Sequence, residues 1–509
     1  MRLQNQLLTL LMVNAVVIVR PAFAQPGLPE LPPDAVPVAE PLPLEDADPV
    51  PNSFPESPAN TSSQAVSLTE ADVVMLLLQN NLELRNASLE RIAQQQELQE
   101  AESIFLPDVT PTISFGITGR ENEPTDTTRE ARLRAELLTP LGTDIELSVD
   151  IDDRELDLSL PQPLLRGAGR AVNTSQVEIA RLREENNQLD LRQRLITDIT
   201  SGVLTYHALI RAQASLQIQQ LSLETQQQQR RSIAALVEAG RRAQFELVEI
   251  DANLAATETS VLEAENDLEQ AKSDLLDLLD IEDSLEITIP EETLATLNTI
   301  AREFVMPSLD QLVAIAYSNR PDYQQLQFNL QIAELDELVA VDNRRWNLDV
   351  RANASTGDFS EASTELVLTH LLDNESTETA FQRNQVTQLQ LQNDLDRLNS
   401  DIRLDVADQL RNVESARNRI ESTRLARELA EKRLENALAR ARLGRSRDIF
   451  EALELQNDVV AAQNNEVNAA IDLADAIASL NQSLGTTLTV WADQVEASQL
   501  LITPALSEP

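Results

Sequence analysis

The sequence predicts a mainly helical fold with a smaller β part, in which a long helical hairpin occurs twice. Three observations predict this fold class. The chain has 509 residues but only 11 glycines and 3% aromatic residues, whereas average usage gives roughly 7% glycine. Gln, Leu, Ala, Glu and Arg dominate instead, which favours long helices. The same order of segments then occurs twice, and each copy contains a stretch with the period of a β-strand.

The ionisable residues exclude most enzymatic and metal-binding chemistry. The chain has no cysteine, so disulfides, thiolate metal sites and cysteine nucleophiles are excluded. His207 and His370 are its only histidines, too few for most metal or general-base sets. We therefore expect no catalytic residue, no cofactor, no metal ion and no enzyme activity. The net charge of 40 − 84 = −44 also opposes nucleic-acid binding, which depends on Lys and Arg.

The first 24 residues have the pattern of a secretory signal peptide. Arg2 precedes an apolar stretch at Leu7–Val19, and Ala22–Ala24 forms an A-x-A cleavage site. The alternative, a membrane anchor, needs about twenty apolar residues, whereas Asn14 and Pro21 interrupt this stretch. No later segment is apolar enough to span a bilayer as a helix, so an exported chain would be periplasmic, secreted or in an outer membrane.

Residues 25–66 are rich in proline and acidic residues, as in Pro41-Leu42-Pro43. Such a composition favours extended polyproline conformations and cannot bury a core. We interpret this segment as a linker.

Two structural repeats, residues 67–281 and 308–485, follow the linker. A shift of 308 − 69 = 239 residues places Thr69, a predicted helix cap, on Ser308 of a predicted capping box. Further along, the shift is 444 − 240 = 204 residues and places Gly240 on Gly444. The first repeat therefore carries 239 − 204 = 35 additional residues, which lie in its β-like part.

Strands are predicted within residues 110–162 of the first repeat and 346–370 of the second. Apolar residues alternate with polar ones at Ile113–Ile117, Ile145–Ile151 and Leu156–Leu160, and more weakly at Leu348–Ala354 and Leu366–Leu368. One face of each strand is thus apolar and the other polar or acidic. A half-buried sheet of a soluble protein would give the same alternation.

Long helical hairpins are predicted at residues 173–280 and 380–484. The run from 173 to 240 would extend roughly 100 Å as a helix at 1.5 Å per residue. Residues 282–307 would connect the repeats, and residues 486–509 would form a C-terminal tail.

The duplicated order, together with the run Leu-Ser-Leu-Pro-Gln-Pro-Leu-Leu-Arg-Gly-Ala-Gly at 158–169, resembles the TolC-like outer-membrane efflux protein family. The resemblance covers about Thr69 to Gly485. Pro163 lacks the N–H that a strand ladder needs, and Gly167 relieves a sharp turn. Six residues of this chain resemble the strand-to-helix transition of the family: Gln162, Pro163, Leu164, Leu165, Arg166 and Gly167.

The resemblance implies a homotrimer whose chains share one membrane β-barrel and form a long trimeric α-barrel in the periplasm. It implies a channel-tunnel in the cell outer membrane that is the passive exit duct of a tripartite efflux pump or a type I secretion system. A periplasmic adaptor (membrane fusion) protein and an inner-membrane transporter would be its partners. The exported substrate, whether drug, metal ion or protein, is left open because the transporter selects it.

Two sets of residues match functional regions of the family. The helical turns that dock the adaptor correspond to Ala239, Gly240 and Arg241 and to Leu443, Gly444 and Arg445; each glycine also suits a helix C-cap. Glu431 and Glu435, by their distance from the turn, are candidates for a lumenal gate that would favour cations.

The alternative function is a periplasmic coiled-coil adaptor or scaffold protein. It explains the export signal and the helices, but it does not explain amphipathic strands at matching positions of both repeats. His370 stands roughly where Pro163 stands in the first repeat, and we interpret it as a strand-end residue. His207, on a helix, is interpreted as packed or solvated.

Overall fold

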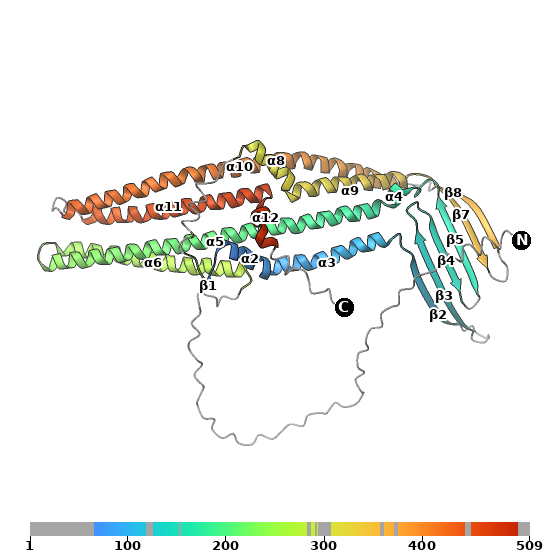
Figure 1. Cartoon of the computed structure of the whole chain (residues 1–509), viewed down its shortest axis with the longest axis horizontal. Helices are drawn as coiled ribbons and strands as arrows, with labels where there is room; N and C mark the ends of the chain where they lie inside the picture. The colour runs from blue at the N-terminus through green and yellow to red at the C-terminus, as the bar shows by residue number, and fades with distance from the viewer. Residues whose placement is uncertain are drawn as a thin grey trace, which may run out of the picture. The chain divides into compact units, whose positions relative to one another are not determined.

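The computed structural model describes residues 66–118, 126–151, 154–281, 287–290, 293, 307–356, 361–370, 375–442 and 449–496. These lie in one compact unit, Ser63–Pro509. The predicted signal peptide, almost all of the predicted linker, the end of the tail and the turn residues Leu443–Arg445 lie outside the described residues. Within the described part the chain is mostly helical and has a six-stranded sheet at one end of the helices (Figure 1).

The first repeat contains a short helical pair, four strands of the large sheet and a long helical hairpin. Its elements are β1 (Val66–Ser67), α2 (Glu70–Asn80), α3 (Leu82–Ser103), β2 (Asp108–Thr118), β3 (Asp126–Leu138), β4 (Asp144–Asp150), β5 (Glu155–Pro163), α4 (Arg170–Asn173), α5 (Ser175–Glu238) and α6 (Gln244–Leu278). β6 (Ile287–Thr288) lies in the predicted connecting segment, most of which is outside the described residues.

The second repeat has the same order with only two strands in the large sheet. Its elements are α8 (Leu309–Asn319), α9 (Pro321–Asn343), β7 (Asn347–Thr356), β8 (Glu361–Thr369), α10 (Glu375–Arg442) and α11 (Ile449–Leu484). α12 (Thr487–Val490) lies in the predicted C-terminal tail. Among the described residues, no helix is both long enough and apolar enough to cross a bilayer.

The two repeats begin with the same helix-capping device. The Thr69 side chain accepts the N–H of Asp72 at 3.3 Å, and the Asp72 carboxylate accepts the N–H of Thr69 at 2.9 Å. Ser308 and Gln311 form the corresponding capping box of α8, in which the N–H of Ser308 donates to Gln311 at 3.1 Å. Both predicted caps are confirmed, and each satisfies two N–H groups that a helix start leaves unpaired.

The helices bury two large apolar cores, one centred on each repeat, and a third, small cluster of Ile233, Ile250 and Leu453. In the first, α2, α5 and α6 pack around Leu77, Leu209 and Leu275, each no more than 1% exposed. In the second, α8, α10 and α11 pack around Val413 and Leu473, exposed to the same slight extent. Leu209 and Val413 are related by the predicted shift of 204, so the repeat seen in the sequence is also a repeat of core positions.

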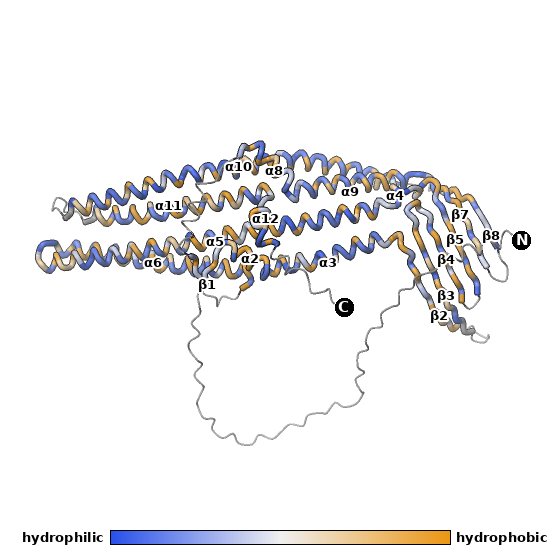
Figure 2. The backbone as a smooth tube through the Cα atoms, viewed as in Figure 1, coloured by the Kyte–Doolittle hydropathy of each residue, from blue (hydrophilic) through white to orange (hydrophobic). Residues whose placement is uncertain are grey.

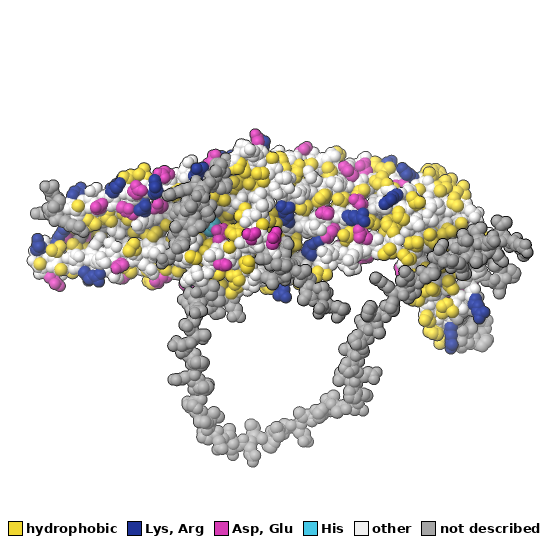
Figure 3. Space-filling model, in the orientation of Figure 1, with side chains coloured by type: hydrophobic (Ala, Val, Ile, Leu, Met, Phe, Trp, Pro, Cys, Tyr) yellow, Lys and Arg dark blue, Asp and Glu magenta, His cyan; other side chains and the backbone are white. Residues whose placement is uncertain are grey.

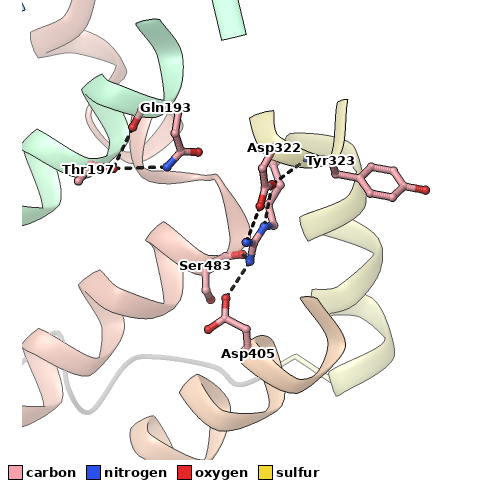
Figure 4. Close-up of polar contacts among 7 residues, drawn as sticks. Gln193, Thr197, Asp322, Tyr323, Asp405 and Ser483 are labelled. Atoms are coloured by element: carbon pink, nitrogen blue, oxygen red, sulfur yellow. Dashed lines mark hydrogen bonds and ion pairs between the residues drawn. The ribbon is translucent and has the colours of Figure 1, made fainter. Parts of the chain in front are cut away.

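Arg320, at the start of α9, joins three helices of the second repeat. Its guanidinium donates to Asp322 of α9 at 2.8 Å, to Asp405 of α10 at 2.7 Å and to the backbone oxygen of Ser483 in α11 at 3.2 Å. Figure 4 shows Asp322, Asp405 and Ser483 converging from these helices. A planar guanidinium can donate to several acceptors at once. These contacts therefore fix the start of α9 against α10 and α11.

The large sheet is antiparallel throughout, in the order β2-β3-β4-β5-β7-β8. β5 of the first repeat pairs with β7 of the second, from Leu156 with Thr356 to Pro163 with Asp349. The strand region covers 56 residues in the first repeat (108–163) and 23 in the second (347–369). The difference, 56 − 23 = 33, is one additional hairpin and accounts for the roughly 35 additional residues seen in the sequence.

Candidate duct surfaces

One face of the large sheet is mostly apolar along its six strands, with Arg129 of β3 as a charged exception opposite Phe115. The register aligns odd-numbered residues of β2, β3 and β4 with even-numbered residues of β5, β7 and β8, as in Leu147 opposite Leu158 and Val350 opposite Leu366. Ile113, Phe115 and Ile117 on β2 are 71–77% exposed, and Figure 3 shows hydrophobic side chains on the surface of the sheet. A continuous exposed apolar face marks a surface that meets lipid or another chain.

The opposite face of the sheet is polar and strongly acidic. Arg132, Arg134 and Arg351 are its basic residues within the strands. Its eleven acidic residues with described side chains are Asp108, Glu130, Glu136, Asp144, Glu146, Asp150, Glu155, Asp157, Asp349, Glu361 and Glu365. In Figure 2 hydrophobic and hydrophilic residues alternate along the strands, as this division requires. The excess of 11 − 3 = 8 carboxylates would attract cations to this face.

The predicted transition residues form the junction where the sheet meets the helices. Pro163 ends β5, as predicted. The N–H of Leu164 then donates to Leu348 at 2.7 Å and that of Arg166 to Trp346 at 3.2 Å, so the chain leaves the sheet alongside the start of β7. Gly167 has a φ of +75°, which agrees with the turn that the sequence predicted there.

Asp342, at the end of α9, is a junction residue that the sequence did not reveal. Its carboxylate accepts the N–H of Gly167 at 2.6 Å and pairs with Arg345 at 3.1 Å, and the residue is 3% exposed. A buried carboxylate needs such partners to offset the loss of water. An aspartate near a helix end is common and gives no periodic signal, so only the fold identifies its role.

His370 follows the last residue of β8, which agrees with its interpretation as a strand-end residue. Its ring stacks on Trp346 with centroids 4.2 Å apart and planes at 9°. This pair belongs to the second repeat's own junction and faces the start of β7.

The turn between α5 and α6 is a Schellman motif centred on Gly240. The N–H of Gly240 donates to the carbonyl of Val237 at 2.9 Å, and that of Arg241 donates to Leu236 at 2.9 Å. Gly240 has a φ of +69°, and a Cβ added there would meet nothing within 4 Å. The predicted C-cap is therefore present, and the turn itself is open to a partner. The other predicted turn, Leu443–Arg445, lies outside the described residues.

The two predicted gate residues differ in their surroundings. Glu431, on α10, accepts a hydrogen bond from Arg427 at 2.9 Å and is partly buried. Glu435, one helical turn further, is exposed. Arg427 also pairs with Glu466 of α11, so part of the Glu431 charge is already balanced within the chain.

His207 lies in a polar cluster between α2, α5 and α11. It is 2% exposed, so it is packed rather than solvated. Its Nδ1 lies 2.6 Å from Oδ1 of Asp475, its Nε2 lies 3.8 Å from Glu70, and this Nε2 has no hydrogen-bond partner. Burial raises the pKa of Glu70; the nearby His207 lowers it and Asp475 raises it further. A cavity of about 210 Å³ adjoins Glu70, His207 and Trp491.

The described residues contain no group of three or more His, Asp or Glu side chains arranged to hold a metal ion.

Comparison with known proteins shows which proteins have a similar sequence and a similar fold. Residues 73–279 match the family model of the outer membrane efflux protein, which confirms the resemblance seen in the sequence. No curated protein matches the sequence of this chain.

Solved structures of outer-membrane channels have the same fold. The outer-membrane channel OprN is 18% identical, with a TM-score of 0.61 over 82% of this chain and 90% of that one. The CmeC outer membrane channel of Campylobacter jejuni is 14% identical, with a TM-score of 0.60 over 85% and 92%. The MtrE outer membrane channel of Neisseria gonorrhoeae is 14% identical, with a TM-score of 0.64 over 86% and 95%. Family and fold together support an outer-membrane efflux channel.

Proposed function

We propose that the chain is one protomer of a homotrimeric channel-tunnel in the outer membrane, which acts as the passive exit duct of a tripartite efflux pump or a type I secretion system. The observation that supports this most strongly is the sheet, whose six strands share one mostly apolar face, well exposed on the edge strands β2 and β8, and one acidic face. A sheet inside lipid needs such a division when water fills the space behind it.

The helices would continue the duct into the periplasm. One side of each long hairpin is rich in polar residues, as expected for helices with water on one side. The Gly240 turn lies at the end of the hairpin that is opposite to the sheet (Figure 1). Residues Ala239–Arg241 and Leu443–Arg445 would therefore contact a periplasmic adaptor, and an inner-membrane transporter would supply both energy and substrate.

The acidic residues predict a cation-selective duct. The polar face of the sheet contributes an excess of eight carboxylates per chain among the described side chains, and Glu431 with Glu435 would form a second acidic ring in each trimer. Like charges brought together around one axis raise the local concentration of cations.

Single-channel recording tests this function. The protein would be extracted with detergent and inserted into a planar bilayer with a salt gradient across it. Discrete currents whose reversal potential shows cation selectivity would support the duct. A protein that washes from membranes with carbonate and gives no current would instead be the periplasmic scaffold or adaptor.

A further inference from the structure

The cavity beside α12 has a polar end whose groups call for a ligand. The cavity has a volume of about 210 Å³, larger than the roughly 150 Å³ that accommodates benzene in an engineered protein core. Its walls come from α2 and α5 of the first repeat, from α11 of the second and from α12 of the tail. Figure 1 shows α12 beside α5 and α11. A molecule in this cavity would therefore touch both repeats.

His207 supplies the first polar group of the cavity. Its Nδ1 lies 2.6 Å from one carboxylate oxygen of Asp475, and the other oxygen accepts a hydrogen bond from Arg211 at 3.2 Å. A carboxylate paired with arginine is ionised and can only accept, so Nδ1 carries the proton and the neutral ring has a lone pair at Nε2. His207 is 2% exposed, and its Nε2 has no hydrogen-bond partner among the described residues. Such a buried acceptor needs a donor.

Glu70 supplies the second polar group. Its Oε1 lies 3.8 Å from Nε2 of His207, and its side chain is 28% exposed, which leaves a way in from solvent. Two acceptors at this distance cannot bond to each other, but one donor group between them can reach both. Burial raises the pKa of Glu70, because its ionised carboxylate has lost water without gaining a full set of partners.

The ion pairs around His207 leave one negative charge unbalanced. The charged side chains linked to it, directly or through one another, are Glu70, Asp472 and Asp475 on one side and Arg211 and Arg419 on the other. With a neutral His207 their sum is 2 − 3 = −1. A ligand with one positive charge would neutralise this cluster.

The remaining wall of the cavity is mostly apolar. Its apolar residues are Val203, Ala474, Ile477, Ala478, Val490 and Trp491. The hydroxyl oxygens of Thr200 and Thr487, which also line it, lie 3.5 Å from each other. A hydrated inorganic cation suits such a wall poorly, whereas a hydrocarbon body would displace water from it. The indole face of Trp491 also favours a nearby cation.

We propose that this cavity binds a small organic amine in its protonated form, with the ammonium group between Glu70 and His207 and an alkyl or aryl body against Val203, Ile477 and Trp491. The ammonium would donate one hydrogen bond to Nε2 of His207 and another to the Glu70 carboxylate. Because the walls come from both repeats, the bound amine would stabilise the packing of α5 against α11. The site lies within one chain, so this inference is independent of the proposed channel function.

Thermal unfolding of the detergent-solubilised full chain tests the site, with benzylammonium as the probe. At about pH 7.5 carboxyl groups are ionised and an ordinary amine is still protonated. We expect a saturable rise in the unfolding temperature with benzylammonium concentration. Benzyl alcohol keeps the body without the charge, and methylammonium keeps the charge without the body. Neither should produce a comparable rise at the same concentrations.

Three variants locate the binding. Glu70→Gln removes the charge at nearly constant size and should weaken benzylammonium binding about tenfold or more, the usual effect of losing a hydrogen bond to a charged group. Ala474→Leu fills part of the cavity and should abolish the rise. Glu224→Gln removes an exposed charge elsewhere on α5 and should bind like the parent.

Tryptophan fluorescence gives a second measurement that does not depend on unfolding, in case Ala474→Leu fails to fold. The chain has two tryptophans, so Trp346→Phe leaves Trp491 as the single emitter. Benzylammonium should change the emission of Trp491 along the same titration curve, and adding Glu70→Gln should shift that curve to concentrations about tenfold higher or more.

Four results would overturn the site. Equal rises with methylammonium would mean that the cation acts on the acidic protein as a whole. Equal rises with benzyl alcohol would mean that the ammonium group has no place between Glu70 and His207. Equal binding by Glu70→Gln and the parent would exclude the carboxylate as a partner. The absence of any saturable change in unfolding temperature and in Trp491 emission would exclude binding altogether.

Discussion

The carboxylate of Asp342 accepts the backbone N–H of Gly167 at 2.6 Å, and this contact joins the end of α9 to the strand-to-helix junction of the other repeat. Both partners are buried or half-buried. The sheet and the two sets of helices therefore meet at a point fixed by one charged side chain and one backbone group.

Replacing Asp342 tests that junction. Asp342→Ala leaves the Gly167 N–H without its acceptor, and we expect a loss of about 1.5–3 kcal/mol in stability, the usual value for a hydrogen bond to a charged group. Asp342→Asn keeps an acceptor oxygen and should lose clearly less. The measurement is the temperature at which the gel band of the folded protein is replaced by the band of the unfolded protein. Equal losses in the two variants would mean that the charge, and not the Gly167 bond, matters.

Two glycines with positive φ provide a matched pair. A Cβ at Gly142, in the turn after β3, would lie 2.3 Å from the carbonyl oxygen of Gly167, whereas one at Gly240 would meet nothing within 4 Å. Gly240→Ala should therefore cost only the conformational penalty of about 1–2 kcal/mol. Gly142→Ala must also displace the junction backbone and should reduce the amount of folded protein in the membrane. If the two variants accumulate equally, the turn after β3 does not pack on the junction as described.

The helices were the most predictable part of this fold. The capping boxes at Thr69 and Ser308 and the helix end at Gly240 are local features, set by residues within one turn of each other. The alternation in β4 and β5 was equally clear, because leucine, isoleucine and valine occupy every second position.

β3 was not singled out, and the reason is physical. Its mostly apolar face carries Arg129 and two alanines beside Leu133 and Leu137, and its other face carries four charged residues of either sign, so the period of two is weak. Asp342 and the cluster around His207 gave no signal either. Their partners are 175 and 268 residues away, and one sequence without its fold does not show such contacts.

Neutralising the two proposed gate residues should have unequal effects. Glu435→Gln removes an exposed charge and should shift the reversal potential of the channel toward that of a less cation-selective pore. Glu431→Gln should shift the reversal potential less, because Arg427 already balances the charge of Glu431 at 2.9 Å. The substitution would also leave Arg427 with one acidic partner fewer. Single-channel recording in a salt gradient measures both. If neither variant changes selectivity, the acidic face of the sheet alone determines it.

His207 should stabilise the contact between α5 and α11. His207→Leu removes the partner that Asp475 has at 2.6 Å, and we expect a loss of about 1.5 kcal/mol or more. His207→Asn keeps a donor near the position of Nδ1 and should lose less, although it fills less of the buried space. Urea unfolding of the detergent-solubilised protein gives both values. A leucine variant as stable as the parent would show that Arg211, which contacts Asp475 at 3.2 Å, is sufficient for that carboxylate.

The same cluster predicts the sign of a pH effect through Glu70. Burial raises the pKa of Glu70, opposed by His207 and reinforced by Asp475. The folded state therefore binds this proton more tightly than the unfolded state does. The stabilising contribution is fully present below the ordinary pKa of about 4.5 and is lost as the pH rises through the raised value of the folded state.

Glu70→Gln mimics the protonated form, so it should be more stable than the parent at neutral pH and should equal it in acid. Unfolding midpoints of the two proteins between acidic and neutral pH measure this difference, and a variant that is less stable at neutral pH would show that the ionised carboxylate of Glu70 is favourable in the folded protein.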